Sequence, residues 1–420
     1  MALALLLVPA YVDAAPGDGV RSGNLQLNPG LMVGAGYDTN LYYQSGRETR
    51  DLRQAPHGIL EPRLKMSIVE PTNFDFNFDA ALGWTQYFHD ENIVRRQSGL
   101  STTLIGSGIV NPNGAVSLRV TERFVRTNEP PNAPTAARLN RIGNRLGATL
   151  GFHPGGRVLE SFLGYDYVIH RHNLYPTLDR NEHHVGWKNQ WRFLPKTGFV
   201  LNADYRVIRY NSDFQGGSSV RPDGRLHNAN STPIRLTGGV SGLITNRISL
   251  RILGGYGWGL YEAGPTIEGP LAHVEATYLF GAQALRNRFR LGYELNFSDS
   301  VVGNYYSFHR FYTNYEQGIL NNRLRFSLGA DAQMRNYSRL EVRVIETDDR
   351  VITLPADAAD LLVGVQAGAT YHISNAWSAG IQYGFGSNFT DDIITIDGPG
   401  RDAVRDYQRH HVMVSTTLTY

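Results

Sequence analysis

The chain has 420 residues, with 40 basic and 38 acidic side chains, a net charge of +2 and no cysteine. The near-balance of charge argues against nucleic acid as a partner, and the lack of cysteine excludes disulfides, thiolate metal sites and thiol nucleophiles. No apolar run after the N-terminal segment approaches the roughly 20 residues of a membrane helix. Glycine and aromatic residues are abundant, with 45 Gly, 23 Tyr and 18 Phe.

The N-terminal segment, residues 1–15, predicts a secretory signal peptide. It opens with an apolar stretch and ends in Val12-Asp13-Ala14-Ala15-Pro16, which is the layout of an apolar core followed by a small-residue cleavage site. A basic region before the apolar stretch is missing, which suggests that Met1 is a misplaced start. The alternative is a buried N-terminal strand or short helix. We expect a mature protein, residues 16–420, that is exported through the periplasm.

Apolar and polar residues alternate along most of the mature chain. In the segment 74–85, aromatic or aliphatic residues occupy the even positions and mostly polar or small residues the odd ones. A period of two predicts β-strands with one apolar and one polar face. The predicted strands are 27–43, 58–70, 74–88, 95–106, 115–125, 140–153, 158–172, 182–194, 198–210, 233–242, 248–261, 271–281, 288–297, 305–317, 323–337, 360–373, 377–389 and 405–420.

The connections between these strands are alternately short and long. The short ones have turn-forming sequences and include 70–73, 153–156, 194–197, 245–247, 320–322 and 374–376. The long polar ones include 45–57, 126–139, 211–232, 338–359 and 390–404. An even number of antiparallel strands with this alternation is typical of an outer-membrane barrel. We therefore predict an all-β fold, a single transmembrane antiparallel β-barrel of about 18 strands (about 16 as the alternative), with short periplasmic turns and longer extracellular loops.

Soluble all-β folds are the competing interpretation. A β-sandwich array or a propeller also contains many strands, but a propeller would show repeats with recurrent motifs, and none is visible here. The predicted strands are also longer than the five or six residues usual in soluble sheets. We therefore expect the protein in the outer membrane of a Gram-negative bacterium, in contact with lipid and lipopolysaccharide.

The C-terminal segment supports this location. Alternate residues from Val412 to Tyr420 share one strand face, and the last residue is aromatic. This resembles the C-terminal strand of bacterial outer-membrane barrels, whose terminal aromatic residue is read by the insertion machinery. The resemblance implies that Tyr420 is an insertion signal and that the barrel-assembly machinery is a partner.

If the apolar face meets lipid, the polar face lines the lumen. A barrel of about 18 strands leaves an aqueous channel, and an Arg or Lys facing the middle of the bilayer would cost about 2–4 kcal/mol. The candidate lumen-lining residues are Arg119, Arg123, Asp166, Lys188, Arg192, Asp204, Arg206, Arg251, Arg290, Glu294, Arg310, Arg325, Asp331 and Arg335. Two interpretations stay open: cross-lumen ion-pair ladders that stiffen the wall, or a permeation path with a weak preference for anionic or highly hydroxylated solutes.

Aromatic residues form two groups. Those near predicted strand ends are interpreted as interfacial girdles: Tyr37, Tyr42, Tyr43, Trp84, Tyr87, Phe88, Tyr210, Tyr261 and Tyr420. The run 305–315 has aromatic residues on both faces, so Tyr306, Phe308 and Tyr312 are candidates for pointing inward and stacking on carbohydrate rings. The alternative for these three is plain girdle or lumen packing.

No catalytic constellation stands out, so we expect no enzyme activity, no catalytic residues, no cofactor and no metal site. The glycines at 254, 255, 257 and 259 are followed by no phosphate-loop Lys-Ser/Thr, and we interpret them as residues that curve a strand. Three histidine pairs, 170/172, 183/184 and 410/411, fall near predicted extracellular strand ends and are interpreted as a solvated polar rim.

The first predicted strand, Leu31–Tyr42, contains the tetrad Tyr37-Asp38-Thr39-Asn40 and resembles the opening strand of the β-barrel porin 2 family. That family typically has an acidic residue where this chain has Thr39. The turns 194–197 and 244–247 are also similar. Members are outer-membrane barrels often encoded with exopolysaccharide biosynthesis and export genes. The resemblance therefore implies a channel that assists exopolysaccharide secretion, with periplasmic polysaccharide-export components as partners, and it supplies no functional residues.

Three functions follow from these patterns. The first is a channel for exopolysaccharide export, the second a general or solute-specific diffusion porin for uptake, and the third a structural or adhesive barrel without an open pore. A long loop folded into the lumen, at 211–232 or 338–359, would favour uptake. Sugar-facing aromatic residues in a wide lumen would favour export.

Overall fold

The computed structural model of the chain describes residues 19–43, 52–127, 140–154, 156, 158–173, 179–211, 229–281, 287–300, 304–337, 359–390, 393–395, 402–404 and 406–420. The predicted signal peptide, residues 1–15, and nearly all of the predicted loops 211–232 and 338–359 lie outside these residues. In the described part of the chain, no helix is long and apolar enough to cross a membrane.

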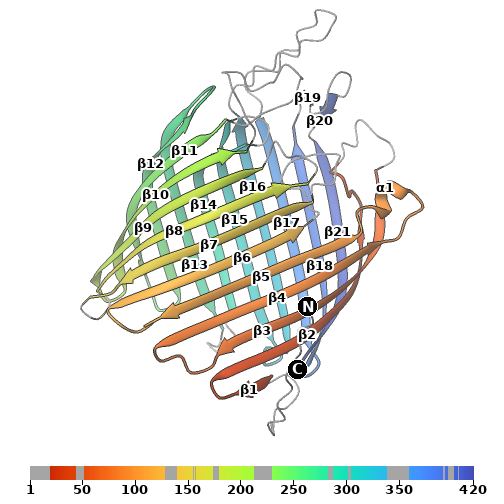
Figure 1. Ribbon diagram of the computed structural model, residues 1–420, viewed down its shortest axis with the longest axis horizontal. Coiled ribbons are helices and arrows are strands. Elements are labelled where there is room, and N and C mark those ends of the chain that lie inside the picture. Colours follow the sequence, from red (N-terminus) through yellow and green to blue (C-terminus); the bar gives the residue numbers. More distant parts are fainter. Residues whose placement is uncertain are drawn as a thin grey trace, which may run out of the picture.

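Eighteen long strands make up the wall of the molecule (Figure 1). They are β2 (Leu25–Asp38), β3 (Ala55–Ile68), β4 (Phe74–Tyr87), β5 (Gly99–Val110), β6 (Val116–Thr127), β7 (Arg141–Phe152), β8 (Leu159–His172), β9 (Arg180–Leu194), β10 (Thr197–Tyr210), β11 (Ser231–Leu243), β12 (Ile248–Tyr261), β13 (Ile267–Phe280), β14 (Asn287–Asp299), β15 (Tyr305–Ile319), β16 (Leu324–Tyr337), β17 (Ala359–His372), β18 (Trp377–Phe389) and β21 (Tyr407–Thr419). A nineteenth, short strand, β1 (Val20–Ser22), pairs only with the start of β2.

The sheet closes on itself through its first and last long strands. Strand β2 pairs with β3 on one side and with β21 on the other, in a register that runs from Gly30↔Thr419 to Asp38↔His411. Every other long strand pairs antiparallel with its neighbours in sequence. Closure gives every long strand a partner on both sides, as a sheet in hydrocarbon requires. The predicted all-β antiparallel barrel is confirmed, with 18 strands rather than the alternative 16.

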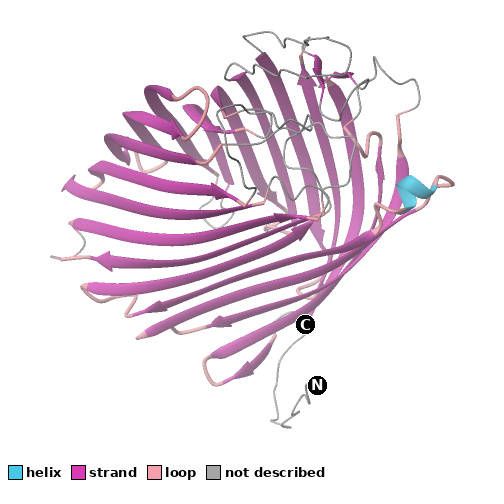
Figure 2. Ribbon diagram, turned by 45° about the horizontal axis from the view of Figure 1, so that its top comes forward, coloured by secondary structure: helices cyan, strands magenta, loops and turns pink. Residues whose placement is uncertain are grey.

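Short turns and the C-terminus share one end of the barrel. The turn between β15 and β16, for example, has three successive residues with positive φ, Leu320, Asn321 and Asn322, a conformation that asparagine tolerates well. The opposite end carries the short helix α1 (Asn92–Arg95), seen at the rim in Figure 2, and the small hairpin of β19 (Ile393–Thr395) and β20 (Asp402–Val404).

Two predicted strands are displaced from their observed positions. The strand expected at 95–106 is β5, Gly99–Val110, because α1 occupies the residues just before it. The strand expected at 27–43 ends at Asp38. The buried Asp38 carboxylate accepts a hydrogen bond of 3.0 Å from the Asn40 backbone N–H, a local turn that stops the ladder.

The large apolar side chains lie on the outside of the barrel. Leu163, Leu291 and Val414, for example, keep more than half of their surface exposed (53%, 53% and 56%). The buried apolar cluster is small by contrast and consists of Leu41, Tyr42, Ala55 and Val94, beside α1. An exposed apolar surface of this extent needs lipid around it, so the barrel spans a membrane.

Candidate functional site: the inner wall of the barrel

Side-chain direction follows the alternation along each strand, because successive side chains point to opposite faces. On β6, the exposed residues Val116, Leu118 and Val120 mark the lipid face, so Arg119 and Arg123 lie on the inner face. The same argument places the remaining candidate residues on the inner face: Asp166, Lys188, Arg192, Asp204, Arg206, Arg251, Arg290, Glu294, Arg310, Arg325, Asp331 and Arg335. Their role in permeation stays a prediction.

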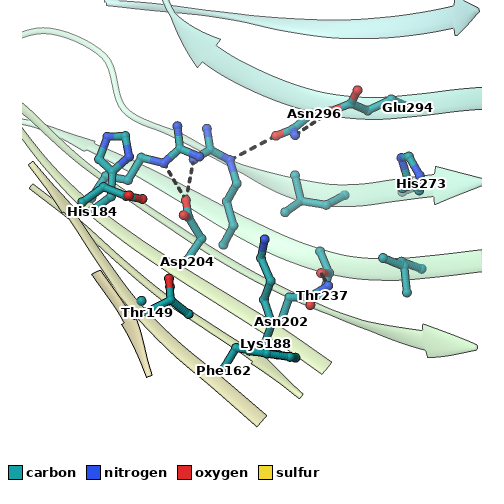
Figure 3. A pocket seen from close by; sticks show the side chains of 18 of the residues that line it. Thr149, Phe162, His184, Lys188, Asn202, Asp204, Thr237, His273, Glu294 and Asn296 are labelled. Carbon is teal, nitrogen blue, oxygen red and sulfur yellow. Dashed lines mark hydrogen bonds and ion pairs between the residues drawn. The ribbon is translucent and has the colours of Figure 1, made fainter. Parts of the chain in front are cut away.

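A concavity of about 410 Å³ lies against the inner wall between β7 and β14 (Figure 3). Asp204 stands at its centre, and two arginines converge on this carboxylate. The Arg206 guanidinium lies 2.7 Å from it and the Arg235 guanidinium 3.4 Å. Polar residues such as Lys188 and Asn202 and apolar residues such as Phe162 and Leu253 complete the lining. The surface carries several charged side chains and is built from several strands, as expected for the wall of an aqueous channel.

The inner-wall ion pairs join neighbouring strands or residues of one strand. Arg145 on β7 pairs with Asp166 on β8 at 2.6 Å, and Arg310 on β15 pairs with Asp331 on β16 at 3.7 Å. Among the described residues no ion pair crosses the lumen, so the interpretation as cross-lumen ladders is wrong. Adjacent strands bring facing side chains within about 5 Å, whereas opposite walls of a barrel this wide are beyond the reach of two side chains.

A second concavity of about 360 Å³ lies on the inner wall between β10 and β16. Four arginines line it, Arg206, Arg235, Arg310 and Arg335, and among the described residues the one carboxylate in its lining is Asp331. Arg335 is almost fully buried, stacks over the Tyr306 ring at 4.5 Å and donates a hydrogen bond to Gln333. Asp204 of the first concavity pairs with Arg206 and Arg235, so two carboxylates offset these four arginines, and the positive charge that is left raises the local concentration of anions.

The three candidate aromatic residues of β15 also lie on the inner face. Tyr306 and Phe308 border the arginine-lined concavity. The Tyr312 hydroxyl donates a 2.8 Å hydrogen bond to the Glu275 carboxylate, and its ring lies across Gly292, where a Cβ atom would stand 2.1 Å from the ring. Tyr306 is partly covered by Arg335, and Phe308 is buried. These rings are packed against the wall, and a sugar-stacking role stays a prediction.

Several aromatic residues that were predicted to form the interfacial girdles do not face lipid. Tyr42 is buried beside α1, and its hydroxyl donates to the Ile93 carbonyl. Tyr43 lines a third concavity, of about 350 Å³, and Tyr210 and Tyr261 lie on the inner face of β10 and β12. The girdle interpretation is wrong for these four residues. A residue near a strand end faces lipid only if it belongs to the strand and occupies one of its outward-facing positions.

A buried polar cluster near the loop end of β8 and β9 was not found from the sequence. The Glu182 carboxylate pairs with Arg180 at 2.5 Å, His184 at 2.8 Å and His170 at 3.3 Å. His184 is buried rather than part of a solvated rim. The parity of β9 alone places Arg180, Glu182 and His184 inward, but their burial depends on neighbouring strands.

No family model and no curated protein matches the chain. Among solved structures, Pseudomonas aeruginosa OccK2 (OpdF) is similar at 10% identity and a TM-score of 0.47, covering 94% of this chain and 98% of that one. Pseudomonas aeruginosa OprD has 10% identity and a TM-score of 0.43, with coverages of 97% and 99%. A BenF-like porin from Pseudomonas fluorescens Pf-5 has 9% identity and a TM-score of 0.47, with coverages of 95% and 99%.

The location of the protein follows from its own geometry. A closed, even-stranded antiparallel barrel with an apolar outer belt, a charged inner wall and short turns at the end that holds the C-terminus has the build of a bacterial outer-membrane barrel. The protein is an outer-membrane β-barrel, and at 18 strands such a barrel leaves an aqueous channel.

Proposed function

We propose that the protein is a passive diffusion channel that favours small anionic, hydroxyl-rich solutes. The observation that supports this most directly is the arginine-lined concavity, where four arginines outnumber their two nearby carboxylates, Asp331 and Asp204. Fixed cations that line an aqueous path select for anions. Arginine also binds carboxylate, phosphate and hydroxyl oxygens through several N–H donors at once.

The test is single-channel recording in a planar lipid bilayer with a salt gradient across it. We expect discrete conducting steps and a reversal potential of the sign for anion preference. Clear cation selectivity would contradict the preference, and purified protein that inserts but never conducts would contradict the channel itself.

A second candidate is assistance to exopolysaccharide secretion, with periplasmic export components as partners. It is favoured by the inward-facing Tyr306, Phe308 and Tyr312 beside Arg310 and Arg335, since aromatic faces and guanidinium groups suit sugar rings. Deletion of the gene separates the two candidates. Loss of surface polysaccharide supports secretion, whereas unchanged polysaccharide with slower entry of small anions supports the diffusion channel.

Two further partners belong to the same proposal. The apolar belt would contact lipid and lipopolysaccharide, and the terminal Tyr420 would be read by the barrel-assembly machinery. The Tyr420 backbone N–H donates a 2.8 Å hydrogen bond to the Pro29 carbonyl at the closing seam, and nearly half of its surface is exposed. Replacing Tyr420 with Ala should slow insertion into the outer membrane, and unchanged insertion would contradict this role.

A further inference from the structure

The pairing between β13 and β14 stops partway along the wall. Their register runs from Phe280↔Asn287 only to Ala272↔Leu295. Beyond that point, residues 267–271 of β13 pair with β12 alone, and residues 296–299 of β14 pair with β15 alone. Pro270, which has no backbone N–H, lies in the part of β13 that has no pairing with β14, where proline is tolerated because one ladder is absent.

Beyond the break, the end of β14 contacts strands that are not its neighbours. The Asp299 carboxylate accepts hydrogen bonds from the Ser231 hydroxyl on β11 at 2.8 Å and from the Tyr261 hydroxyl on β12 at 2.7 Å. In the sheet, β13 lies between β12 and β14. Because Ser231 and Tyr261 are on the inner face, the end of β14 must cross the inner face of β13 to reach them.

Two aromatic residues show the same displacement. By parity Phe297 and Tyr305 should face lipid, like Leu291 and Phe311 on the same strands. Instead Phe297 is 3% exposed and lies on the inner face of Gly257, where a Cβ atom would stand 2.6 Å from its ring. The Tyr305 ring lies 5.7 Å from that of Tyr261. At this end of the β14–β15 hairpin, the face that would point to lipid by alternation is therefore packed on the inner wall.

Side chains replace the missing backbone ladder at Phe297. Its N–H donates to the Asn296 side-chain oxygen at 2.8 Å, and its carbonyl accepts a 2.8 Å hydrogen bond from the Arg235 guanidinium. Arg235 also donates to Asn296 at 3.1 Å and stacks on the Phe297 ring at 4.3 Å. Buried backbone groups released from a sheet need such partners. Arg235 therefore holds the end of β14, residues 296–299, against the inner wall.

Arg235 and Asn296 border both the 410 Å³ and the 360 Å³ concavities, so the segment forms a ridge between them. We infer that the in-folded end of β14, residues 296–299, narrows the conducting path and that Arg235 is the positioning residue that holds it there. This inference deepens the proposed function, on which its conductance test rests.

Two pairs of variants test the inference in single-channel recordings. Arg235→Ala removes the contacts of Arg235 with Asn296 and Phe297. Its control, Arg206→Ala, removes the neighbouring arginine and measures the effect of losing one positive charge. Gly257→Val forces the Phe297 ring away, and Gly254→Val adds the same side chain on the lipid face of β12, where a Cβ atom meets nothing within 4 Å. Arg235→Ala and Gly257→Val should raise conductance over their controls by roughly a factor of two, with added current noise.

A chemical readout separates this inference from the proposed function. The chain has no cysteine, so Ser231→Cys with Asp299→Cys introduces one reporter pair, which a short thiol-specific cross-linker should join in folded protein. Adding Gly257→Val should lower the cross-linking yield, and adding Gly254→Val should not. Equal yields and equal conductances within each pair would overturn the inference. A wild-type protein that does not conduct would contradict the channel, and the yields would still decide whether the segment is in-folded.

Discussion

The wall from β6 to β10 and the wall from β13 to β15 have the same alternating sequence pattern but differ in structure. In the first, ladders run almost the full length of each strand, and outward residues such as Val120 and Leu163 face lipid. In the second, one ladder stops at Ala272↔Leu295, and the outward-parity residue Phe297 is buried inside. Alternation therefore assigns a side chain to a face of its sheet, but the surroundings of that face depend on the neighbouring strand.

The largest difference in unfolding free energy is expected between two phenylalanines that alternation assigns to the same outward face. Phe297→Ala removes a ring enclosed by Gly257, Gly259 and Arg235, and buried Phe→Ala changes cost about 3–5 kcal/mol. Phe311→Ala removes a half-exposed ring on the lipid face, where acyl chains fill the space, and should cost clearly less. Urea-dependent unfolding from lipid vesicles measures both, and equal losses would mean that Phe297 also faces lipid.

Two adjacent residues in the wall from β6 to β10 should show the next largest difference in unfolding free energy. Leu201→Arg puts a charge on the lipid face of β10 and should cost about 2–4 kcal/mol of unfolding free energy if it lies near the bilayer centre. Asn202→Arg puts the same charge on the inner face beside Lys188, in water, and should cost much less. The same unfolding assay compares them. A more costly Asn202→Arg would contradict the assignment of the two faces.

Two aspartates should differ by a smaller amount. Asp299→Ala leaves the buried Ser231 hydroxyl and the partly buried Tyr261 hydroxyl without their acceptor, a loss of about 1–3 kcal/mol. Asp166→Ala breaks the Arg145 pair, in which the Arg145 side chain is half exposed, and such pairs are worth at most about 1 kcal/mol. Asp299→Asn retains one acceptor oxygen and should recover part of the loss, which a purely steric effect would not explain.

The smallest effect is expected in ion selectivity, when one arginine is removed from either region of the wall. Arg310→Gln removes one cation from the arginine-lined concavity and should lower the anion-to-cation permeability ratio by roughly a factor of two. Arg119→Gln removes an exposed cation from the regular wall and should change the ratio less. Reversal potentials in a salt gradient give the ratio. A larger shift for Arg119→Gln would place the selective part of the channel elsewhere.

Much of the fold could be predicted from local pattern. Every predicted strand overlaps an observed one, because the period of two and the turn sequences are properties of neighbouring residues. The in-folded segment could not be predicted, since Phe297 continues the alternation of Leu291 and Tyr293 without a break. Pro270 was the available signal, because proline within a strand indicates an incomplete ladder. The inner position of Tyr261 could have been predicted from the alternation along β12, whereas its hydrogen bond to Asp299 joins residues distant in sequence.

The sequence by itself determined that the chain forms long amphipathic strands, that they are joined by alternating turns and loops, and which side chains share a face. Those features depend on the pleat and on turn preferences, which act over a few residues. Only the tertiary structure decided where the β13–β14 ladder stops and that Arg235 holds Phe297 against Gly257. Those contacts join strands far apart in the chain, and their stability depends on which backbone groups find a partner after the barrel has closed.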